Sequence, residues 1–427
     1  MRNGKTKTAH GLAGGQQEPR RKGERESQEP VGVRGIVLAG VHAWNTDVLE
    51  SVVARPLLPV AGRPLIWHVL QWLRGGGVTQ ASICGNSDTT VLLRRLGDGA
   101  GWDMALEYYE DIMPRGPAGC ARDASVGRRA SAFVVVEGTI VPQVDLLKLL
   151  EAHKSSRAAL TVVVGEGEPR NGSVGENAQP VGIYVFSPGV IEEVPDLGYQ
   201  DIKETLIPRL YNNGKFVGTF AAGGELPPRV TDATSYLALN MWALEETVSG
   251  GPPLPGYARV NGAWIHTSAR VDSAVRFVGD VLVGPGCVIA PGAMIIGPTT
   301  VGAGSTVAEQ AVISRSAVWE RCRVGAAARL DQCILTDDSC LEPGAVLSST
   351  VCVAPLSSRT TIVGRLVSLL RSAHRSDRMG ELGEGQPLPP GGQTARSLPP
   401  SIEPFHPPTM WARQYGRPMS SPLEGKT

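Results

Sequence analysis

An apolar residue recurs at every sixth position toward the C-terminal side of this 427-residue chain. The series runs from Ile265 to Val307, takes one five-residue step, and resumes at Val312. A period of six matches neither an α-helix nor the alternation of a free strand. It predicts short strands that are joined by tight corners and stacked coil on coil. The rungs of this ladder are Ile265, Val271, Phe277, Val283, Ile289, Ile295, Val301, Val307, Val312, Val318, Val324, Leu330, Leu335, Leu341 and Leu347.

The residue four places after a rung is usually small, as at Ala269, Ala293, Ser305 and Ala328. A small side chain permits a tight corner, while the large rung fills the interior. This pattern resembles the hexapeptide repeat of left-handed parallel β-helices. Because such a helix buries its rungs only by stacking, we expect a partner subunit on it, in a homo-oligomer or a hetero-oligomer.

Strand and helix patterns alternate upstream of the repeat. We expect strands at residues 35–39, 78–84, 133–136, 160–164 and 181–186, and helices at residues 64–73, 144–153 and 202–211. This alternation predicts an α/β fold with a parallel or mixed sheet that is covered on both faces. Any ligand is expected at the carboxyl ends of the strands.

Several motifs in this upstream part follow one another in the order of a known family. They are GIVLA at residues 35–39, RPLLPVAGRPLI at 55–66, GPAG at 116–119, GIYVFSP at 182–188 and YLALN at 236–240. With the repeat, residues 33–353 resemble the sugar-1-phosphate nucleotidyltransferases, which join a nucleoside triphosphate and a sugar 1-phosphate to give a nucleotide sugar and diphosphate. The resemblance implies a mixed-sheet nucleotide-binding domain of the GT-A or Rossmann-like kind, followed by the β-helix.

The resemblance also implies where a nucleotide or nucleotide sugar binds. The matching positions are Leu38, Ala39, Gly40, Arg55, Gly116, Pro117, Ala118, Gly119, Glu137, Gly138 and Arg229.

The family's phosphate-binding loop is altered in this chain. Its glycines, which let backbone amides approach a triphosphate, are replaced by Val41 and Ala43. Its arginine, which stabilises charge on the departing diphosphate, falls on the neutral Asn45. The lysine of the lead-in falls on Arg55, which keeps the charge but changes its shape and reach.

Both magnesium-binding positions are altered as well. One family aspartate falls on Thr139, and the other, counted back from Tyr236, falls on Arg229. Magnesium requires hard oxygen ligands, and a cation in place of a carboxylate repels it. Two neighbouring carboxylates are weak alternatives. Glu137 is expected to face the other side of its strand, and Asp232 requires a shift of register.

These changes share the reacting side of the pocket, so we expect a binding or regulatory homologue without ordinary magnesium-dependent chemistry. In this hypothesis Arg229 holds a diphosphate directly, or else points to solvent. Two alternatives stay open. One is an active nucleotidyltransferase in which Glu137 or Asp232 holds Mg²⁺ and Arg55 stabilises phosphate. The other is an acyltransferase that uses His266, which we expect to be structural.

Composition argues against several classes of partner. Lys and Arg total 41, as do Asp and Glu, so no basic excess favours nucleic acid or an anionic membrane. The seven cysteines contain no C-x-x-C pair and are expected to be reduced and mostly buried. No apolar run has the length of a membrane span or a signal peptide, which favours the cytoplasm.

Low-complexity sequence marks both ends of the chain. Residues 1–32 and the Pro-rich residues 376–427 are expected to be disordered tails. Residues 356–375 are expected to form a short helix that packs on its own protein. The predicted domains are then residues 33–250 for the nucleotidyltransferase-like part and residues 251–355 for the β-helix.

Overall fold

The computed structural model describes residues 32–40, 48–86, 89–111, 113–165, 179–249 and 254–354. These residues all fall within one compact unit that begins at Gly32. The two predicted tails, the predicted helix at 356–375 and the loop positions Val41, Ala43 and Asn45 lie outside the described residues.

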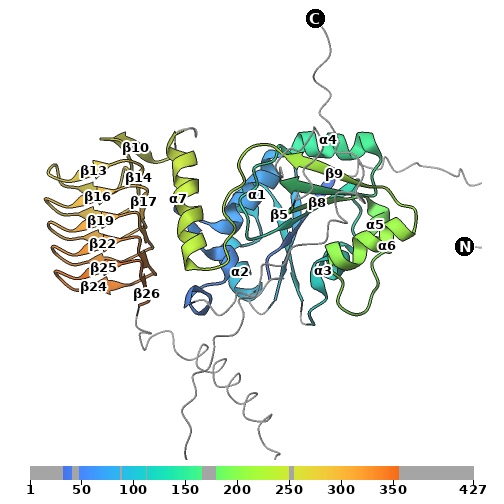
Figure 1. The fold of residues 1–427 in the computed structure, drawn as a ribbon, viewed down its shortest axis with the longest axis horizontal. Coiled ribbons are helices and arrows are strands. Elements are labelled where there is room, and N and C mark those ends of the chain that lie inside the picture. Colours follow the sequence, from blue (N-terminus) through green and yellow to red (C-terminus); the bar gives the residue numbers. More distant parts are fainter. Residues whose placement is uncertain are drawn as a thin grey trace, which may run out of the picture. The chain divides into compact units, whose positions relative to one another are not determined.

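The N-terminal half of the described chain is built on a seven-stranded mixed sheet with the strand order β5-β4-β1-β6-β8-β7-β9 (Figure 1). Its strands are β1 (Val33–Leu38), β4 (Gln80–Gly85), β5 (Ala105–Glu110), β6 (Ala132–Glu137), β7 (Leu160–Gly165), β8 (Pro180–Phe186) and β9 (Val217–Ala222). β8 runs antiparallel to both of its neighbours, and the other pairs are parallel. The expected mixed sheet is therefore confirmed.

Two strands of this sheet, β5 and β9, are missing from the sequence prediction. Both lie at its edges. The sequence of β5, ALEYYE, has one buried residue and carries two carboxylates, and β9 contains Gly218 and two terminal alanines. Neither segment has the continuous apolar run that marks a strand buried on both faces.

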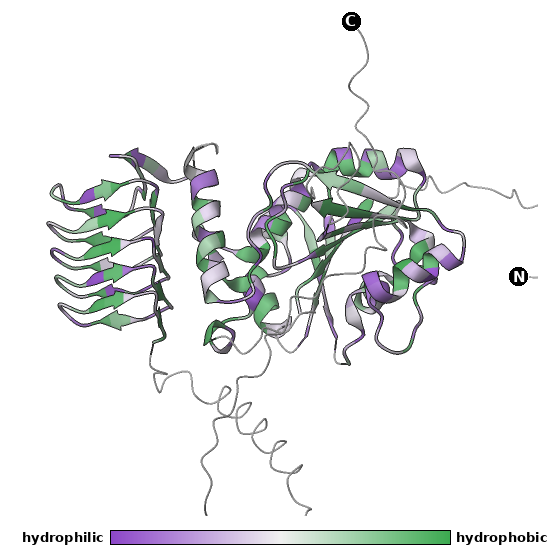
Figure 2. Ribbon diagram, viewed as in Figure 1, coloured by the Kyte–Doolittle hydropathy of each residue, from purple (hydrophilic) through white to green (hydrophobic). Residues whose placement is uncertain are grey.

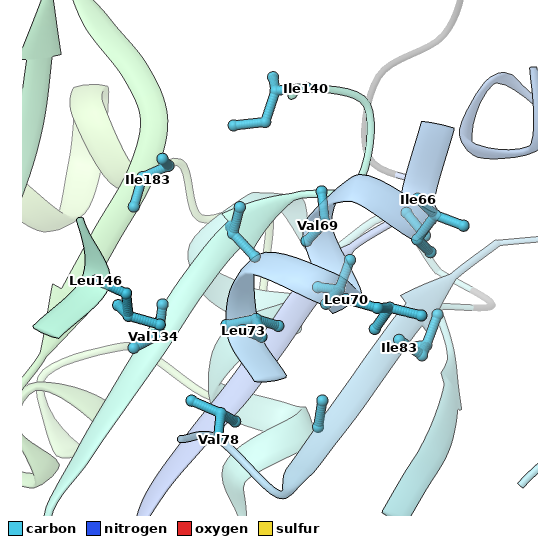
Figure 3. Packing of buried hydrophobic residues seen from close by; sticks show 14 of the residues in the cluster. Ile66, Val69, Leu70, Leu73, Val78, Ile83, Val134, Ile140, Leu146 and Ile183 are labelled. Carbon is cyan, nitrogen blue, oxygen red and sulfur yellow. The ribbon is translucent and has the colours of Figure 1, made fainter. Parts of the chain in front are cut away.

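Helices cover both faces of the sheet, as expected. They are α1 (Leu65–Gly75), α2 (Thr89–Leu96), α3 (Gly116–Ser125), α4 (Leu146–Ser156), α5 (Pro188–Glu192) and α6 (Ile207–Asn212). The side chains of α1, α2 and α4 join one buried apolar cluster, and those of α3, α5 and α6 join the other. Figure 3 shows Ile66, Val69, Leu70 and Leu73 of α1 pointing toward the strands of the first cluster.

The predicted helix at residues 202–211 is divided. A π-helical turn, η4 (Ile202–Leu206), precedes α6, and Asp201 caps it by accepting hydrogen bonds from the backbone amides of Lys203 and Glu204. Three short 3₁₀ segments, η1 (Val48–Ser51), η2 (Arg55–Leu57) and η3 (Ala100–Trp102), and the small hairpin β2 (Pro59–Val60) and β3 (Arg63–Pro64) complete this part.

The repeat forms three stacked parallel sheets, which is the arrangement of a left-handed β-helix (Figure 1). An antiparallel pair, β10 and β11, opens it. Its strands are β10 (Tyr257–Val260), β11 (Ala263–His266), β12 (Arg270–Val271), β13 (Arg276–Val278), β14 (Val281–Val283), β15 (Val288–Ile289), β16 (Met294–Ile296), β17 (Thr299–Val301), β18 (Thr306–Val307), β19 (Val312–Ser314), β20 (Ala317–Val318), β21 (Arg323–Val324), β22 (Arg329–Asp331), β23 (Ile334–Leu335), β24 (Cys340–Leu341), β25 (Val346–Ser348) and β26 (Val351–Cys352).

The predicted rungs fill the interior of the β-helix, with one correction. Ile313 is fully buried in the interior cluster, whereas the predicted rung Val312 points outward and is partly exposed. The five-residue step therefore falls after Ile313, where the backbone at Arg315 adopts a left-handed conformation with φ of 46°. The sequence does not distinguish the two positions because both neighbours are β-branched and apolar. Figure 2 shows hydrophobic residues in every coil of the β-helix, together with hydrophilic ones.

A long helix, α7 (Ala233–Ser249), links the sheet domain to the β-helix. Tyr236 donates a hydrogen bond to the Pro59 carbonyl at 2.6 Å and accepts one from Trp319 Nε1 at 2.8 Å. Asn240 accepts from the backbone amide of Ala61 at 2.9 Å. The YLALN motif thus connects the β2–β3 hairpin to the β-helix through hydrogen bonds. Its two polar residues, Tyr236 and Asn240, stabilise the packing of the fold.

The seven cysteines are free, and five of them are buried, while Cys340 is exposed and Cys352 is intermediate. This confirms the expectation of reduced, mostly buried thiols. In the part of the chain that the structure describes, no helix is both long enough and apolar enough to span a membrane.

Candidate functional site

The carboxyl ends of β1, β4 and β6 meet at one edge of the sheet, where the family's nucleotide loop begins. The backbone amide of Ala39 donates to the Cys84 carbonyl at 2.7 Å, and the amide of Gly138 donates to the Leu38 carbonyl at 2.8 Å. Gly40 lies so close to Asn86 that an added Cβ would meet the Asn86 amide nitrogen at 2.5 Å. The predicted residues Leu38, Ala39, Gly40 and Gly138 are therefore together, at the edge where α/β sheets bind ligands.

Arg55 opens the 3₁₀ segment η2, directly before Pro56. Partial burial lowers the pKa of the Arg55 guanidinium, and the nearby carboxylates of Glu50 and Glu137 oppose this shift. An arginine remains charged in such surroundings. The structure thus brings the positive charge of Arg55 into the field of Glu137.

The central feature of the site is an ion pair between Arg229 and Glu137. The Arg229 guanidinium donates to Glu137 Oε2 at 3.0 Å, and the two side chains are 47% and 9% exposed. Both pack over Gly182, where an added Cβ would meet Glu137 Cδ at 2.6 Å and the Arg229 guanidinium at 2.7 Å. Gly182 also has a φ of 83°, which glycine adopts without strain.

We expected Glu137 to face the other side of its strand from Thr139, and the structure shows its contact with Arg229. Arg229 is the residue that the family resemblance aligns with a family aspartate. The strand β6 ends at Glu137, and the chain turns at Gly138 and Thr139. The alternation of a strand therefore cannot be extended from Glu137 to the altered metal position Thr139.

Asp232, the other alternative carboxylate, serves as a helix cap. Its Oδ1 accepts from the backbone amide of Ser235 at 2.7 Å, and its own amide donates to Ser235 Oγ at 2.9 Å. These bonds lower the pKa of the exposed Asp232 carboxyl. The pair satisfies amides at the start of α7, in the manner of a capping box.

The GPAG segment forms the first turn of α3 and is buried in full: Gly116, Pro117, Ala118 and Gly119. The backbone amides of Ala118 and Gly119 donate to the Gln200 carbonyl at 3.0 and 3.4 Å. The Gln200 amide in turn donates to the Arg115 carbonyl at 2.7 Å. A nucleotide that used these two amides would have to displace the Gln200 carbonyl.

His266, the alternative acyltransferase residue, lies at the entry of the β-helix. Its Nδ1 accepts from the backbone amide of Ser268 at 3.2 Å, and its ring packs edge-on against Tyr257 at 5.0 Å between centroids. Both contacts fix the first corner of the β-helix.

Sequence reasoning missed Lys203 and Gln200. Lys203 lines a cavity together with Arg229, and Gln200 covers the start of α3. Gln200 lies just before the expected helix at residues 202–211 and Lys203 in its first turn, where no ligand motif had been recognised. The sequence DIKETLIP after Gln200 carried a helix-cap signal, Asp201, but nothing that indicated a ligand.

The residues that the family resemblance aligns with the metal ligands do not fit magnesium. They are a hydroxyl at Thr139 and a guanidinium at Arg229, and the remaining carboxylate, Glu137, is bonded to that guanidinium. Mg²⁺ prefers an octahedral set of oxygens and is repelled by a cation at contact distance. Among the described residues, no group of three or more His, Cys, Asp or Glu side chains is arranged to hold a metal ion.

Comparison with known families agrees with this architecture. Residues 34–174 match the Nucleotidyl transferase family, and residues 280–315 match six repeats of the bacterial transferase hexapeptide family. The protein combines a nucleotidyl transferase domain with C-terminal hexapeptide repeats.

The homologues of this nucleotidyl transferase domain protein are sugar-1-phosphate nucleotidyltransferases. A mannose-1-phosphate guanylyltransferase of Mycobacterium tuberculosis is 26% identical over 298 residues, which cover 60% of this chain and 83% of the relative. A probable mannose-1-phosphate guanylyltransferase 3 of Oryza sativa subsp. japonica is 24% identical over 285 residues, with 60% and 78% covered. A glucose-1-phosphate thymidylyltransferase of Streptomyces griseus is 25% identical over 186 residues, with 38% and 51% covered.

Proposed function

We propose that this protein binds a nucleotide sugar, of which GDP-mannose is the first candidate, without carrying out the magnesium-dependent transfer of its family. The observation that carries the proposal is the Arg229–Glu137 ion pair, 3.0 Å long, in which Arg229 is the residue that the family resemblance aligns with a metal ligand. The mannose-1-phosphate guanylyltransferases among the relatives support the choice of GDP-mannose.

Arg229 is suited to hold a diphosphate directly. A guanidinium has five N–H donors, and the contact to Glu137 uses one of its nitrogens. Nearly half of the Arg229 side chain is exposed, so the donors on its outer edge are accessible to a ligand. Arg55 adds a second positive charge near Glu137. A diphosphate between the two arginines would form charge-assisted hydrogen bonds without a metal.

The role of such a protein would be regulatory. Its β-helix exposes two of three sheets, while α7 packs against the third through Leu244, Leu282, Trp319 and Ile334. We propose that the β-helix joins a second copy of this chain or an active nucleotidyltransferase. Binding of the product nucleotide sugar to this subunit would then signal to the other subunit how much nucleotide sugar has been made. Such regulation would act in surface-polysaccharide synthesis or in other nucleotide-sugar metabolism.

Calorimetric titration of the full chain with GDP-mannose tests the proposal. We expect binding of equal strength in magnesium and in excess chelator, and at least tenfold weaker binding to Arg229→Ala. The matched control is Arg276→Ala, which removes an exposed arginine from the β-helix. Binding that vanished with chelator, or that was unchanged in Arg229→Ala, would overturn the proposed role of Arg229.

A further inference from the structure

A groove of about 240 Å³ lies between α7 and the last coils of the β-helix. One wall is the N-terminal half of α7, from Ala233 to Met241. The other wall is formed by β23, β26 and the corners that precede these strands. Pockets that bind small molecules span about 300–1,000 Å³, so this groove is small for a free ligand. Its size suits a few side chains of a protein segment instead.

The lining of the groove is apolar and uncharged. Leu237 and Met241 of α7 face Ile334 and Val351 of the β-helix across it. Ala238 lies between the two α7 residues, is exposed, and has a side chain small enough for another chain to approach the helix closely. No lining residue carries a charge. Such a groove favours the apolar stripe of an amphipathic helix, because this removes apolar surface from water on both sides.

The groove lies where α7 covers its sheet of the β-helix least. Farther along the helix, Leu244 packs on Leu282, and both are buried. At the other end of the sheet, Ile334 is buried in the cluster, whereas Val351 on the neighbouring strand β26 is only partly buried. β26 is the last strand of this sheet in the part of the chain that the structure describes. Apolar surface is therefore left open at the last coil.

The chain itself carries an amphipathic segment close to this groove. The described residues end at Ala354, whose backbone amide donates to Thr336 Oγ1 at 3.3 Å on the last coil. Residues 355–361 follow, and an extended chain of that length spans roughly 20 Å. That reach exceeds the width of one helix, which is about 10–12 Å. An apolar stripe at helical spacing comes next, at Ile362, Leu366, Leu369 and Leu370.

We propose that residues 361–375 of this chain bind in the groove as a helix, with the apolar stripe toward α7 and β26. Arg371 and Arg375 fall on the opposite face of this helix and would remain in water. A helix of this length is marginal alone in water, so the groove would supply the burial that stabilises it. The docked helix would hold α7 against the last coil and would leave the other two sheets of the β-helix for a partner subunit. The inference does not rest on the proposed binding of a nucleotide sugar.

Hydrogen exchange of the full chain, followed by mass spectrometry, tests the proposal from both sides of the contact. The amides of residues 361–375 should exchange at least tenfold more slowly than those of a free peptide of the same sequence. Leu366→Asp, in the apolar stripe, and Ala238→Arg, in the groove, should each remove this protection.

Each variant has a matched control. Ser368→Asp places the same charge on the opposite face of the proposed helix, and Glu245→Arg places an arginine at an exposed position of α7 outside the groove. Both should keep the protection. Unchanged exchange in β14 and β17 shows in every variant that the fold is intact.

Three outcomes would overturn the inference. Exchange of residues 361–375 at the rate of the free peptide would mean that the segment does not dock. Protection that survives Ala238→Arg in the folded protein would place the segment elsewhere. Protection that is lost on dilution would assign the groove to a second copy of the chain, because a segment of the same chain docks independently of protein concentration.

Discussion

The β-helix can be compared with the edge of the sheet at the carboxyl ends of β1, β4 and β6, where we expect a ligand. The two regions differ in how far their sequences depart from the pattern expected of them. In the β-helix, the rungs from Ile265 to Leu347 keep an apolar side chain at every position, and most of them are buried. At the carboxyl ends of β1, β4 and β6 the scaffold is equally complete, but the family resemblance aligns Thr139 and Arg229 with positions at which the family has carboxylates. Both regions are therefore well packed, and the departures from the family's motifs that we infer lie in only one of them.

The largest effect is expected inside the β-helix. Ile313 is fully buried in the stack of rungs, so Ile313→Ala should lower the free energy of unfolding by about 2–5 kcal/mol through lost contacts and a cavity. Val312→Ala, at the neighbouring outward position, should cost less than about 1 kcal/mol. Urea denaturation followed by circular dichroism measures both. Equal losses would contradict the rung assignment.

The next largest loss of stability is expected at the contact of Asn240 with the β2–β3 hairpin and the β-helix. Asn240 accepts from the Ala61 amide at 2.9 Å and donates to Thr300 Oγ1 at 3.3 Å, and it is buried. Asn240→Ala leaves the Ala61 amide unpaired and should cost about 2–3 kcal/mol. The matched change Asn213→Ala removes an exposed hydrogen bond to Glu193 and should cost less than about 1 kcal/mol. A small loss for Asn240→Ala in urea denaturation would show that the contact is not stabilising.

The sheet domain should also be the more sensitive region to acid. His153 lies buried between the hydroxyls of Thr161 and Ser187, at 2.7 and 3.1 Å, and burial lowers its pKa to about 4. An unfolded histidine has a pKa of about 6.5, so the unfolded state binds a proton first as the pH falls. The stability that neutral His153 contributes is complete above the unfolded pKa, and about 2 kcal/mol of it is lost by pH 5.

Urea denaturation at pH 7 and pH 5 checks this dependence. His153→Gln should reduce the difference between the two pH values, because its side chain does not titrate. Part of the difference should remain, since burial also lowers the pKa of His68 to about 4. An unchanged difference in His153→Gln would assign the acid sensitivity to other groups.

The smallest effect separates the cysteines of the β-helix. Cys340 points outward from β24, whereas Cys333 is buried at a corner. Maleimide should label native protein at Cys340 first, and Cys340→Ser should remove this rapid phase while changing stability by less than about 0.5 kcal/mol. Cys333→Ser should leave the rapid phase intact. Rapid labelling that survives Cys340→Ser would mean that the stack opens readily.

Sequence alone predicts the scaffold well because its signals are periodic and local. The six-residue ladder and the buried runs of β1, β6 and β7 each carry many consistent positions. The misplaced rung at Val312 shows the limit, since two adjacent β-branched residues satisfy the same pattern. The edge strands β5 and β9 were not predicted because they are partly exposed and lack a continuous apolar run.

The candidate site was predictable in part. Family motifs located Arg55, Glu137 and Arg229, which the structure brings together. The direction of Glu137 was not predictable, since it depends on where β6 ends and on the space above Gly182. Lys203 and Gln200 were missed because they approach from a segment distant in sequence, and only the folded chain places them beside Arg229 and α3.

The most direct test of the central claim is diphosphate release by the purified full chain. Nucleoside triphosphates and sugar 1-phosphates would be supplied in all pairs with magnesium, beginning with GTP and mannose 1-phosphate. Because the family resemblance aligns Arg229 and Thr139 with the family's metal positions, we expect no turnover above the background without enzyme. Sustained diphosphate release that chelator abolishes would contradict this account and would show that another set of residues holds the metal.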